Sequence, residues 1–292
     1  MSVVVPARDA ASTLPALLEG LRGQSVEGGW ETLIVDNGST DGTGKLARAA
    51  GARVIEYARP GAAAARNAGI RAAESDLVAF LDADCIPRPN WLAPLVEELR
   101  RREDLGGVGG RIVAAAPGTL LESYAERRRY VSQEGALAEP IAPYLLTASC
   151  CYRRDALERL GGLDESLRSG EDLDLSWRLQ RELGLGVALV RDSVVEHVHR
   201  STLQGIWSQW VRYGYGEAQL AVRYPRPAAR EMSAHSAVSW VTERAMRFAR
   251  AAAGLPAGRS TSLDVAEPLL EYFEEAAERV GRRRGARAES KE

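Results

Sequence analysis

The chain has few cysteines and no long apolar run. Its three cysteines, Cys85, Cys150 and Cys151, contain no CxxC pair and form no even set, so a disulfide framework is excluded and reduced, partly buried thiols are expected. No stretch approaches the roughly 18 apolar residues of a membrane span. The opening "MSVVVPARD" lacks the basic and apolar regions of a signal peptide. These absences predict a cytoplasmic protein.

Neither sign of charge dominates. The 292 residues carry 38 basic and 40 acidic side chains, a formal net charge of -2, so no basic field points to nucleic acid. The basic residues are arginines except Lys45 and Lys291, a bias that we interpret as coding preference. The length suits one large domain or one domain with an appendage.

Short apolar runs alternate with helical patterns over the first hundred residues. Four runs have strand character: 2–6, 32–36, 52–57 and 76–82. Strands of this length separated by helices predict βαβ units and a mainly parallel sheet. Ligands bind beyond the carboxyl ends of the strands in such sheets, where this chain has Pro6, Asp36 and Asp82.

Two aspartates, Asp82 and Asp84, stand where the last of these runs ends. In an extended chain residues i and i+2 point the same way, so both carboxylates would face one site. Mg²⁺ and Mn²⁺ prefer oxygen ligands and commonly bridge to phosphates, so the pair suits such an ion. The alternative is that the two aspartates form a solvated acidic strand end. A D-x-D pattern also arises by chance, and this chain has a second one at residues 172–174.

Seven ordered motifs over about residues 2–216 resemble those of family 2 glycosyltransferases. They are "SVVVPARD", "ETLIVDNGSTDGT", "GAAAARNAGIRAA", "DLVAFLDADCIPRPNWL", "LTASCCYRRDALERLGGLDE", "SGEDLDLSWRLQRELG" and "HVHRSTLQGIWSQWVRYGYG". The resemblance implies an α/β fold of the GT-A type over residues 1–225, with a Rossmann-like, mostly parallel central sheet flanked by helices. Residues 226–292 are expected to form a helical C-terminal extension with a disordered tail.

The resemblance also implies how a sugar donor is bound. The family moves a sugar from a nucleotide diphosphate to an acceptor, and a divalent ion, Mn²⁺ or Mg²⁺, neutralises the leaving diphosphate. Asp84 would bind this ion, and His197, with His199 as the runner-up, would complete the metal site. The residues implied to contact the nucleotide-sugar are Pro6, Ala7, Arg8, Asp36, Arg66, Asp82 and Ala83, with Arg59 a weaker candidate.

Some of these donor contacts have structural alternatives. Arg8 stands where family members often have an aromatic side chain, which puts a stacking contact in question. Asp36 begins "DNGSTDG", which would form a good turn in any case. Arg66 lies in an alanine-rich helical pattern, where a surface arginine is the alternative.

The motif "SGEDLDLSWR" matches the family's catalytic Glu–Asp pair. By this resemblance Asp172 takes the proton of the acceptor hydroxyl in an inverting transfer, and Glu171 orients or binds the acceptor. The alternative is that these acids complement the dipole at a helix start. Asp174 and Arg178 are spaced for an ion pair along this helix.

Two features further along the chain are less specific. "QWVRYG" resembles the Q-x-x-R-W element of processive synthases, which makes Gln209 and Arg212 weaker candidates for the site. Helix packing is the alternative for Trp207, Trp210 and Tyr213. "WVTERAMRFARAAAG" is basic and amphipathic, which permits peripheral contact with the inner face of a membrane. A homodimer through the C-terminal helices and ordinary helix packing are the other interpretations.

The sequence therefore predicts a metal-assisted inverting glycosyltransferase with a UDP- or GDP-linked donor. The acceptor stays open among lipid phosphates, glycans, peptides and small molecules. A sugar nucleotidyltransferase is the first rival, although "PARDAAST" lacks the glycine-rich loop expected after its first strand. A non-catalytic scaffold that binds nucleotide-sugars is the second, and the presence of both Asp84 and Asp172 argues against it.

Overall fold

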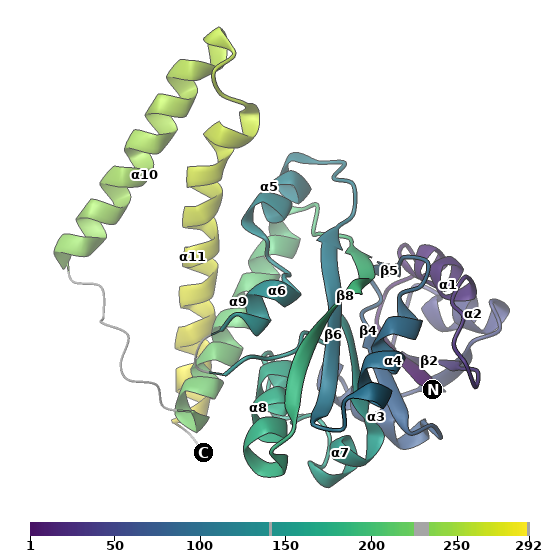
Figure 1. The fold of residues 1–292 in the computed structure, drawn as a ribbon. Helices are drawn as coiled ribbons and strands as arrows, with labels where there is room; N and C mark the ends of the chain where they lie inside the picture. Colours follow the sequence, from purple (N-terminus) through teal and green to yellow (C-terminus); the bar gives the residue numbers. More distant parts are fainter. Residues whose placement is uncertain (140–141, 225–233, 291–292) are drawn as a thin grey trace. The chain divides into compact units, whose positions relative to one another are not determined.

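The computed structural model describes residues 1–139, 142–224 and 234–290, with only the backbone from 234 to 241 (Figure 1). These residues belong to two compact units. The first comprises Met1–Ala115, Tyr130–Leu167 and Glu171–Val198; the second comprises Ala116–Arg129, Arg168–Gly170 and His199–Glu292. This division differs from the domain boundary predicted at residue 225. No helix among the described residues is long and apolar enough to span a membrane.

An eight-stranded sheet forms the centre of the first unit, with the strand order β3-β2-β1-β4-β7-β6-β8-β5. Its strands are β1 (Ser2–Ala7), β2 (Glu31–Asp36), β3 (Arg53–Glu56), β4 (Leu77–Leu81), β5 (Cys85–Pro87), β6 (Leu105–Ala114), β7 (Ser149–Arg153) and β8 (Gly186–His197). β1 to β4 pair in parallel, as do β6 and β8. β7 runs antiparallel to β4 and β6, and β5 antiparallel to β8. The predicted mostly parallel sheet is confirmed, with β7 reversed in its middle and β5 reversed at its edge.

Helices cover both faces of this sheet because its strands are apolar on both sides. Val3 and Val5 of β1 pack on one face with α1 (Leu14–Arg22) and α4 (Leu92–Arg101), whereas Val4 packs on the other. The second face is covered by α3 (Ala62–Ala72), α7 (Arg154–Arg159) and α8 (Glu171–Leu183). The shorter helices are α2 (Thr43–Ala49) and α6 (Gln133–Leu137). This three-layer arrangement brings the carboxyl ends of β1, β2 and β4 to one edge.

β6 contains the run "LGGVGG", in which the glycines make room for neighbouring side chains. A Cβ atom at Gly109 would lie 2.6 Å from Cδ of Gln133. Gln133 is fully buried, and its amide donates to Tyr144 O at 3.2 Å and accepts from Leu146 N at 3.1 Å. The missing side chain of Gly109 thus lets α6 pack closely on the sheet.

The second unit consists of helices. They are α5 (Leu120–Arg128), α9 (Leu203–Arg223), α10 (Ala234–Gly254), a short 3-10 turn (Leu255–Ala257) and α11 (Ser262–Glu289). α9 and α11 approach through glycines: a Cβ atom at Gly281 would collide with Val211 O, and one at Gly285 with Tyr215 O. α11 stays helical to Glu289, and these glycines let its last turns pack closely on α9.

A buried carboxyl group joins α5 to α11 in this unit. Tyr124 donates to Oε2 of Glu274 at 3.1 Å, and Glu274 is only 4% exposed. Its Oε1 atom is buried without a hydrogen-bond partner. Burial raises the pKa of Glu274 to about 7, with the Tyr124 hydrogen bond and the Arg128 charge opposing the shift.

Candidate active site

The Asp82–Ala83–Asp84 tripeptide forms a turn between β4 and β5. Cys85 N donates to Asp82 O at 2.9 Å and closes this turn. The sequence argument assumed an extended chain at this place, and that assumption is wrong. The two carboxylates therefore have different partners. Asp82 pairs with Arg66, whereas Asp84 lies beside His197. One strand end thus supplies acids to two neighbouring clusters.

Arg66 of α3 links two acids that are far apart in the sequence. Its Nη2 donates to Asp82 Oδ1 at 2.5 Å, and its Nη1 donates to Glu171 Oε1 at 2.9 Å. The side chain is 4% exposed, so the alternative of a surface arginine is wrong. Burial works against the charged form, but Asp82 and Glu171 outweigh it and place the pKa of Arg66 above its ordinary value.

Asp172 lies next to this cluster, in the first turn of α8. Its Oδ1 accepts a hydrogen bond from Leu173 N at 2.9 Å. Burial, reinforced by the charge of Glu171 and opposed by that of Arg66, raises the pKa of Asp172 to about 7. This carboxyl group can therefore change protonation state near neutral pH.

The Asp174–Arg178 ion pair helps to hold α8 against the segment around Leu160 and Gly162. Arg178 Nε donates to Asp174 Oδ2 at 2.8 Å, which confirms the predicted ion pair, and Asp174 is fully buried. The remaining nitrogens of Arg178 donate to the carbonyls of Leu160 and Gly162, each at 2.8 Å. The start of α8, with Glu171 and Asp172, is thereby held on a rigid support.

Asp84 and His197 form the core of a candidate metal site. His197 Nε2 lies 3.7 Å from Asp84 Oδ1, and Val198 N donates to Asp84 O at 2.9 Å. The thiol of Cys85 completes a group whose ligand atoms all lie within 4.8 Å of one another. Two atoms bound to one cation at about 2.0–2.2 Å are at most about 4.4 Å apart, so the Asp84–His197 distance fits a shared divalent ion. His199, the predicted runner-up, belongs to the second unit.

The residues predicted to contact the donor lie along the carboxyl ends of β1, β2 and β4. Ala7 is in register with Asp36, and Thr13 Oγ1 donates to Ala83 O at 2.7 Å, which ties the start of α1 to the turn. Pro6 is half-buried and Arg8 is exposed. Asp36 Oδ1 accepts from Ser39 N at 2.9 Å, so its predicted turn-forming role is present.

Two buried asparagines organise this edge and were not identified from the sequence. Asn37 donates to the carbonyls of Tyr57 and Arg59 at 2.9 and 2.7 Å and accepts from Gly61 N at 2.9 Å. It thereby fixes the loop before α3. Asn67 exchanges two hydrogen bonds with the backbone of Leu163, at 2.8 and 2.9 Å. The available signal was that each asparagine directly follows a candidate residue, Asp36 or Arg66.

The remaining candidates occupy other surroundings. Arg59, 68% exposed, pairs with Glu165 at 2.7 Å. In the second unit, Gln209 Nε2 donates to the Tyr213 hydroxyl at 2.8 Å, and the Arg212 guanidinium lies 5.5 Å from the centre of the Tyr213 ring. These contacts lie within α9, and the role of Gln209 and Arg212 in a site stays a prediction.

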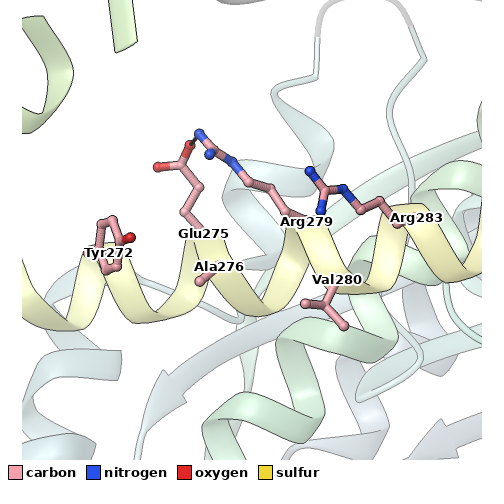
Figure 2. Close-up of a pocket in the computed structure, with 6 residues that line it drawn as sticks. All are labelled: Tyr272, Glu275, Ala276, Arg279, Val280 and Arg283. Atoms are coloured by element: carbon pink, nitrogen blue, oxygen red, sulfur yellow. Dashed lines mark hydrogen bonds and ion pairs between the residues drawn. The ribbon is translucent and has the colours of Figure 1, made fainter. Parts of the chain in front are cut away.

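Two surface hollows contain none of the predicted site residues. One, of about 230 Å³, lies along α11, where Figure 2 shows Tyr272, Arg279 and Arg283 along the same helix. The other, of about 400 Å³, lies in the first unit beside Trp30 and Arg53, near the amino ends of β2 and β3.

Solved structures with this architecture identify the fold as GT-A. A mannosyltransferase from Pyrobaculum calidifontis, solved with GDP-mannose and Mn²⁺, matches with a TM-score of 0.62 at 21% identity, over 96% of this chain and 86% of that one. Glucosyl-3-phosphoglycerate synthase from Mycobacterium tuberculosis, solved with Mn²⁺, UDP and glucosyl-3-phosphoglycerate, matches with a TM-score of 0.55 at 26% identity, over 78% of this chain and 81% of that one. The fold expected from the sequence is confirmed.

The chain belongs to glycosyltransferase family 2. The model of "Glycosyl transferase family 2" matches residues 2–161. The chain is 32% identical over 251 residues to the pre-mycofactocin glycosyltransferase of Mycobacterium tuberculosis, covering 82% of this chain but only about half (52%) of that protein. It is 30% identical over 230 residues to glycosyltransferase AglE of Haloferax volcanii, covering 75% of this chain and 73% of the relative.

Proposed function

We propose that this chain transfers a sugar, with inversion, from a nucleotide-diphospho-sugar to an acceptor hydroxyl, with Asp172 as the base. The observation that carries the proposal is the chain of contacts through the site. Asp172 adjoins the Glu171–Arg66–Asp82 cluster, and Asp82 is two residues from Asp84, which lies beside His197. A proton acceptor and a candidate cation site are thus built into one edge of the sheet.

The donor diphosphate is proposed to bind near Asp84 and His197. A divalent ion held there would supply positive charge that stabilises the leaving nucleoside diphosphate. The protein's own contribution is to hold the turn in place, through the Cys85 and Thr13 hydrogen bonds to Asp82 O and Ala83 O. Pro6, Ala7 and Asp36 are proposed to border the nucleoside, because they end the neighbouring strands.

Asp172 is proposed to take the acceptor proton. As the acceptor oxygen forms a bond to the anomeric carbon, its proton passes to the Asp172 carboxylate, and the bond from that carbon to the diphosphate oxygen breaks. A base with a pKa near 7 combines an ionised fraction with useful basicity at neutral pH. Arg66 fixes Glu171 beside the base, and Glu171 is proposed to orient the acceptor.

The solved neighbours suggest which donors to test first. One was solved with GDP-mannose and another with UDP, so UDP- and GDP-sugars are the donors to test first. The second neighbour was solved with glucosyl-3-phosphoglycerate, a glycosylated small phosphate ester. Small phosphorylated alcohols therefore join lipid phosphates, glycans and peptides among the acceptors to test.

The function is tested by release of nucleoside diphosphate from a panel of UDP- and GDP-sugars with Mn²⁺ or Mg²⁺. We expect Asp84→Ala to abolish metal-dependent release, and Asp172→Asn to lower transfer by about 10²–10⁴-fold while metal-dependent donor binding remains. Glu182→Gln, an exposed change on α8, is the matched control. Pyrophosphate formed from a nucleoside triphosphate and a sugar phosphate would instead identify a nucleotidyltransferase, and donor binding without turnover would identify a scaffold.

For the C-terminal helices we propose contact with an anionic membrane surface. Met246, Phe248 and Leu255 are 49%, 37% and 45% exposed, and the exposed Arg250 lies between them. Exposed apolar and basic side chains together favour an anionic interface. Sedimentation with anionic vesicles, but not with neutral ones, is the expected result. Equal sedimentation with both, or a stable dimer that uses these residues, contradicts it.

A further inference from the structure

The thiol of Cys85 lies beside the Asp84–His197 pair, although cysteine is not part of the D-x-D pattern. Its sulfur, an Asp84 oxygen and a His197 nitrogen all lie within 4.8 Å of one another. Among the described residues this is the one group of three such ligand atoms. Cys150 and Cys151, which are equally buried on β7, belong to no such group.

Strand pairing holds Cys85 in this place. β5 runs antiparallel to β8, and Cys85 is directly opposite His197 in the register. Side chains at directly opposite positions of an antiparallel pair lie on the same face of the sheet, with Cβ atoms about 4.5–5.5 Å apart. The Cys85 N to Asp82 O hydrogen bond and the Val198 N to Asp84 O hydrogen bond fix both ends of this arrangement.

This set of ligands differs in chemistry from a pair of carboxylates. Carboxylate and water ligands suit Mg²⁺ and Mn²⁺, imidazole suits Zn²⁺ and related ions, and thiolate selects soft ions such as Zn²⁺. A Zn–S bond is about 2.3 Å and a Zn–N bond about 2.0 Å, so in a tetrahedral site these two atoms lie about 3.5 Å apart. The ligand atoms, which lie within 4.8 Å of one another, would therefore close by up to about 1.3 Å through side-chain torsions as the ion binds.

We propose that Cys85 is a third protein ligand of this metal site and that its sulfur makes the site prefer thiophilic cations, Zn²⁺, Co²⁺ and Cd²⁺, over Mg²⁺. The proposal rests on the metal site of the proposed function at Asp84 and His197. When the cation binds, a bond forms from the Cys85 sulfur to the metal, the S–H bond breaks, and the proton passes to solvent.

The test is a titration of the metal-free full chain with Co²⁺, followed by absorbance. Wild type is expected to show a near-ultraviolet sulfur-to-cobalt charge-transfer band, which a site of oxygen and nitrogen ligands alone lacks. Zn²⁺ is expected to displace the Co²⁺ at low concentration, whereas Mg²⁺ is not. Cys85→Ser should lose the band and bind Zn²⁺ at least about tenfold more weakly, with a smaller change for Mg²⁺.

Cys151→Ser is the matched control, because Cys151 is also fully buried but has no carboxylate–imidazole pair beside it. It should keep the band. If wild type binds Co²⁺ but shows no charge-transfer band, the proposed role of Cys85 is overturned, and this outcome does not depend on whether the variants fold. The Asp84–His197 metal site would not be affected by that result. Binding of neither Co²⁺ nor Mn²⁺ overturns this proposal and also contradicts the metal part of the proposed function.

Discussion

Arg66 Nη1 lies 2.9 Å from Glu171 Oε1 and joins residues 105 positions apart in the sequence. The same guanidinium group binds Asp82, so one buried arginine side chain keeps two carboxylates together. Without it, Asp82, Glu171 and the adjacent Asp172 would repel one another. The arrangement of the candidate site therefore depends on this arginine.

Replacing Arg66 with methionine is expected to lower the free energy of unfolding by about 3 kcal/mol, because it leaves Glu171, whose side chain is only 12% exposed, without its counter-charge. Urea denaturation measures this loss. Arg71→Met, on the exposed face of the same helix, should cost less than about 1 kcal/mol. Equal losses in the two variants would show that the Arg66 cluster contributes nothing specific.

The pH dependence of transfer should report Asp172. Because its pKa is raised to about 7, the carboxyl group is largely protonated below that pH and cannot accept a proton. We expect kcat/KM of wild type to rise with pH through about 7. Asp172→Asn should remove this rise and lower kcat by about 10²–10⁴-fold. A rise that persists in Asp172→Asn would assign the titration to another group.

Glu274 should make the stability of the second unit depend on pH. Its pKa is raised from 4.5 to about 7 on folding, so its contribution to stability is fully present below pH 4.5 and is lost as the pH rises through about 7. Glu274→Gln should therefore stabilise the fold by up to about 3 kcal/mol at pH 8 and by little at pH 4. Denaturation at both pH values, with the exposed Glu243→Gln as control, measures this.

The contact between α9 and α11 should tolerate no side chain at Gly281. Alanine there would gain about 1 kcal/mol in helix propensity, but its Cβ atom would collide with the carbonyl of Val211. A net destabilisation of about 1–2 kcal/mol is expected. Gly118→Ala, whose Cβ would meet nothing closer than 3.5 Å, is the control for thermal unfolding. Equal melting temperatures would contradict the close packing.

The regular strands and helices could be predicted because their hydrophobic periodicity and their residue propensities are visible in the sequence. The strands β1 to β4 and the helices between them follow from alternating apolar runs. β6 could not be predicted in this way, because glycine is rare in strands and the run "LGGVGG" becomes a strand only through its neighbours. The reversed direction of β7 likewise depends on pairing with β4 and β6 rather than on its own residues.

The candidate site shows the same limit. Topology places Asp36 and Asp82 at strand ends, so they could be found from the sequence. The buried state of Arg66 depends on α8, which is more than a hundred residues away, and Cys85 meets His197 only through the pairing of β5 with β8. Contacts of this kind have no spacing in the sequence that would reveal them.

The close contact between Gly109 and Gln133 should constrain how these two positions change during evolution. Any larger residue at 109 would push the amide of Gln133 away from Tyr144 and Leu146, and a shorter residue at 133 would leave a void beside the strand. Either substitution alone would destabilise the fold, so the two positions are expected to change together. Among homologous chains, a side chain at the first position should accompany a small residue at the second.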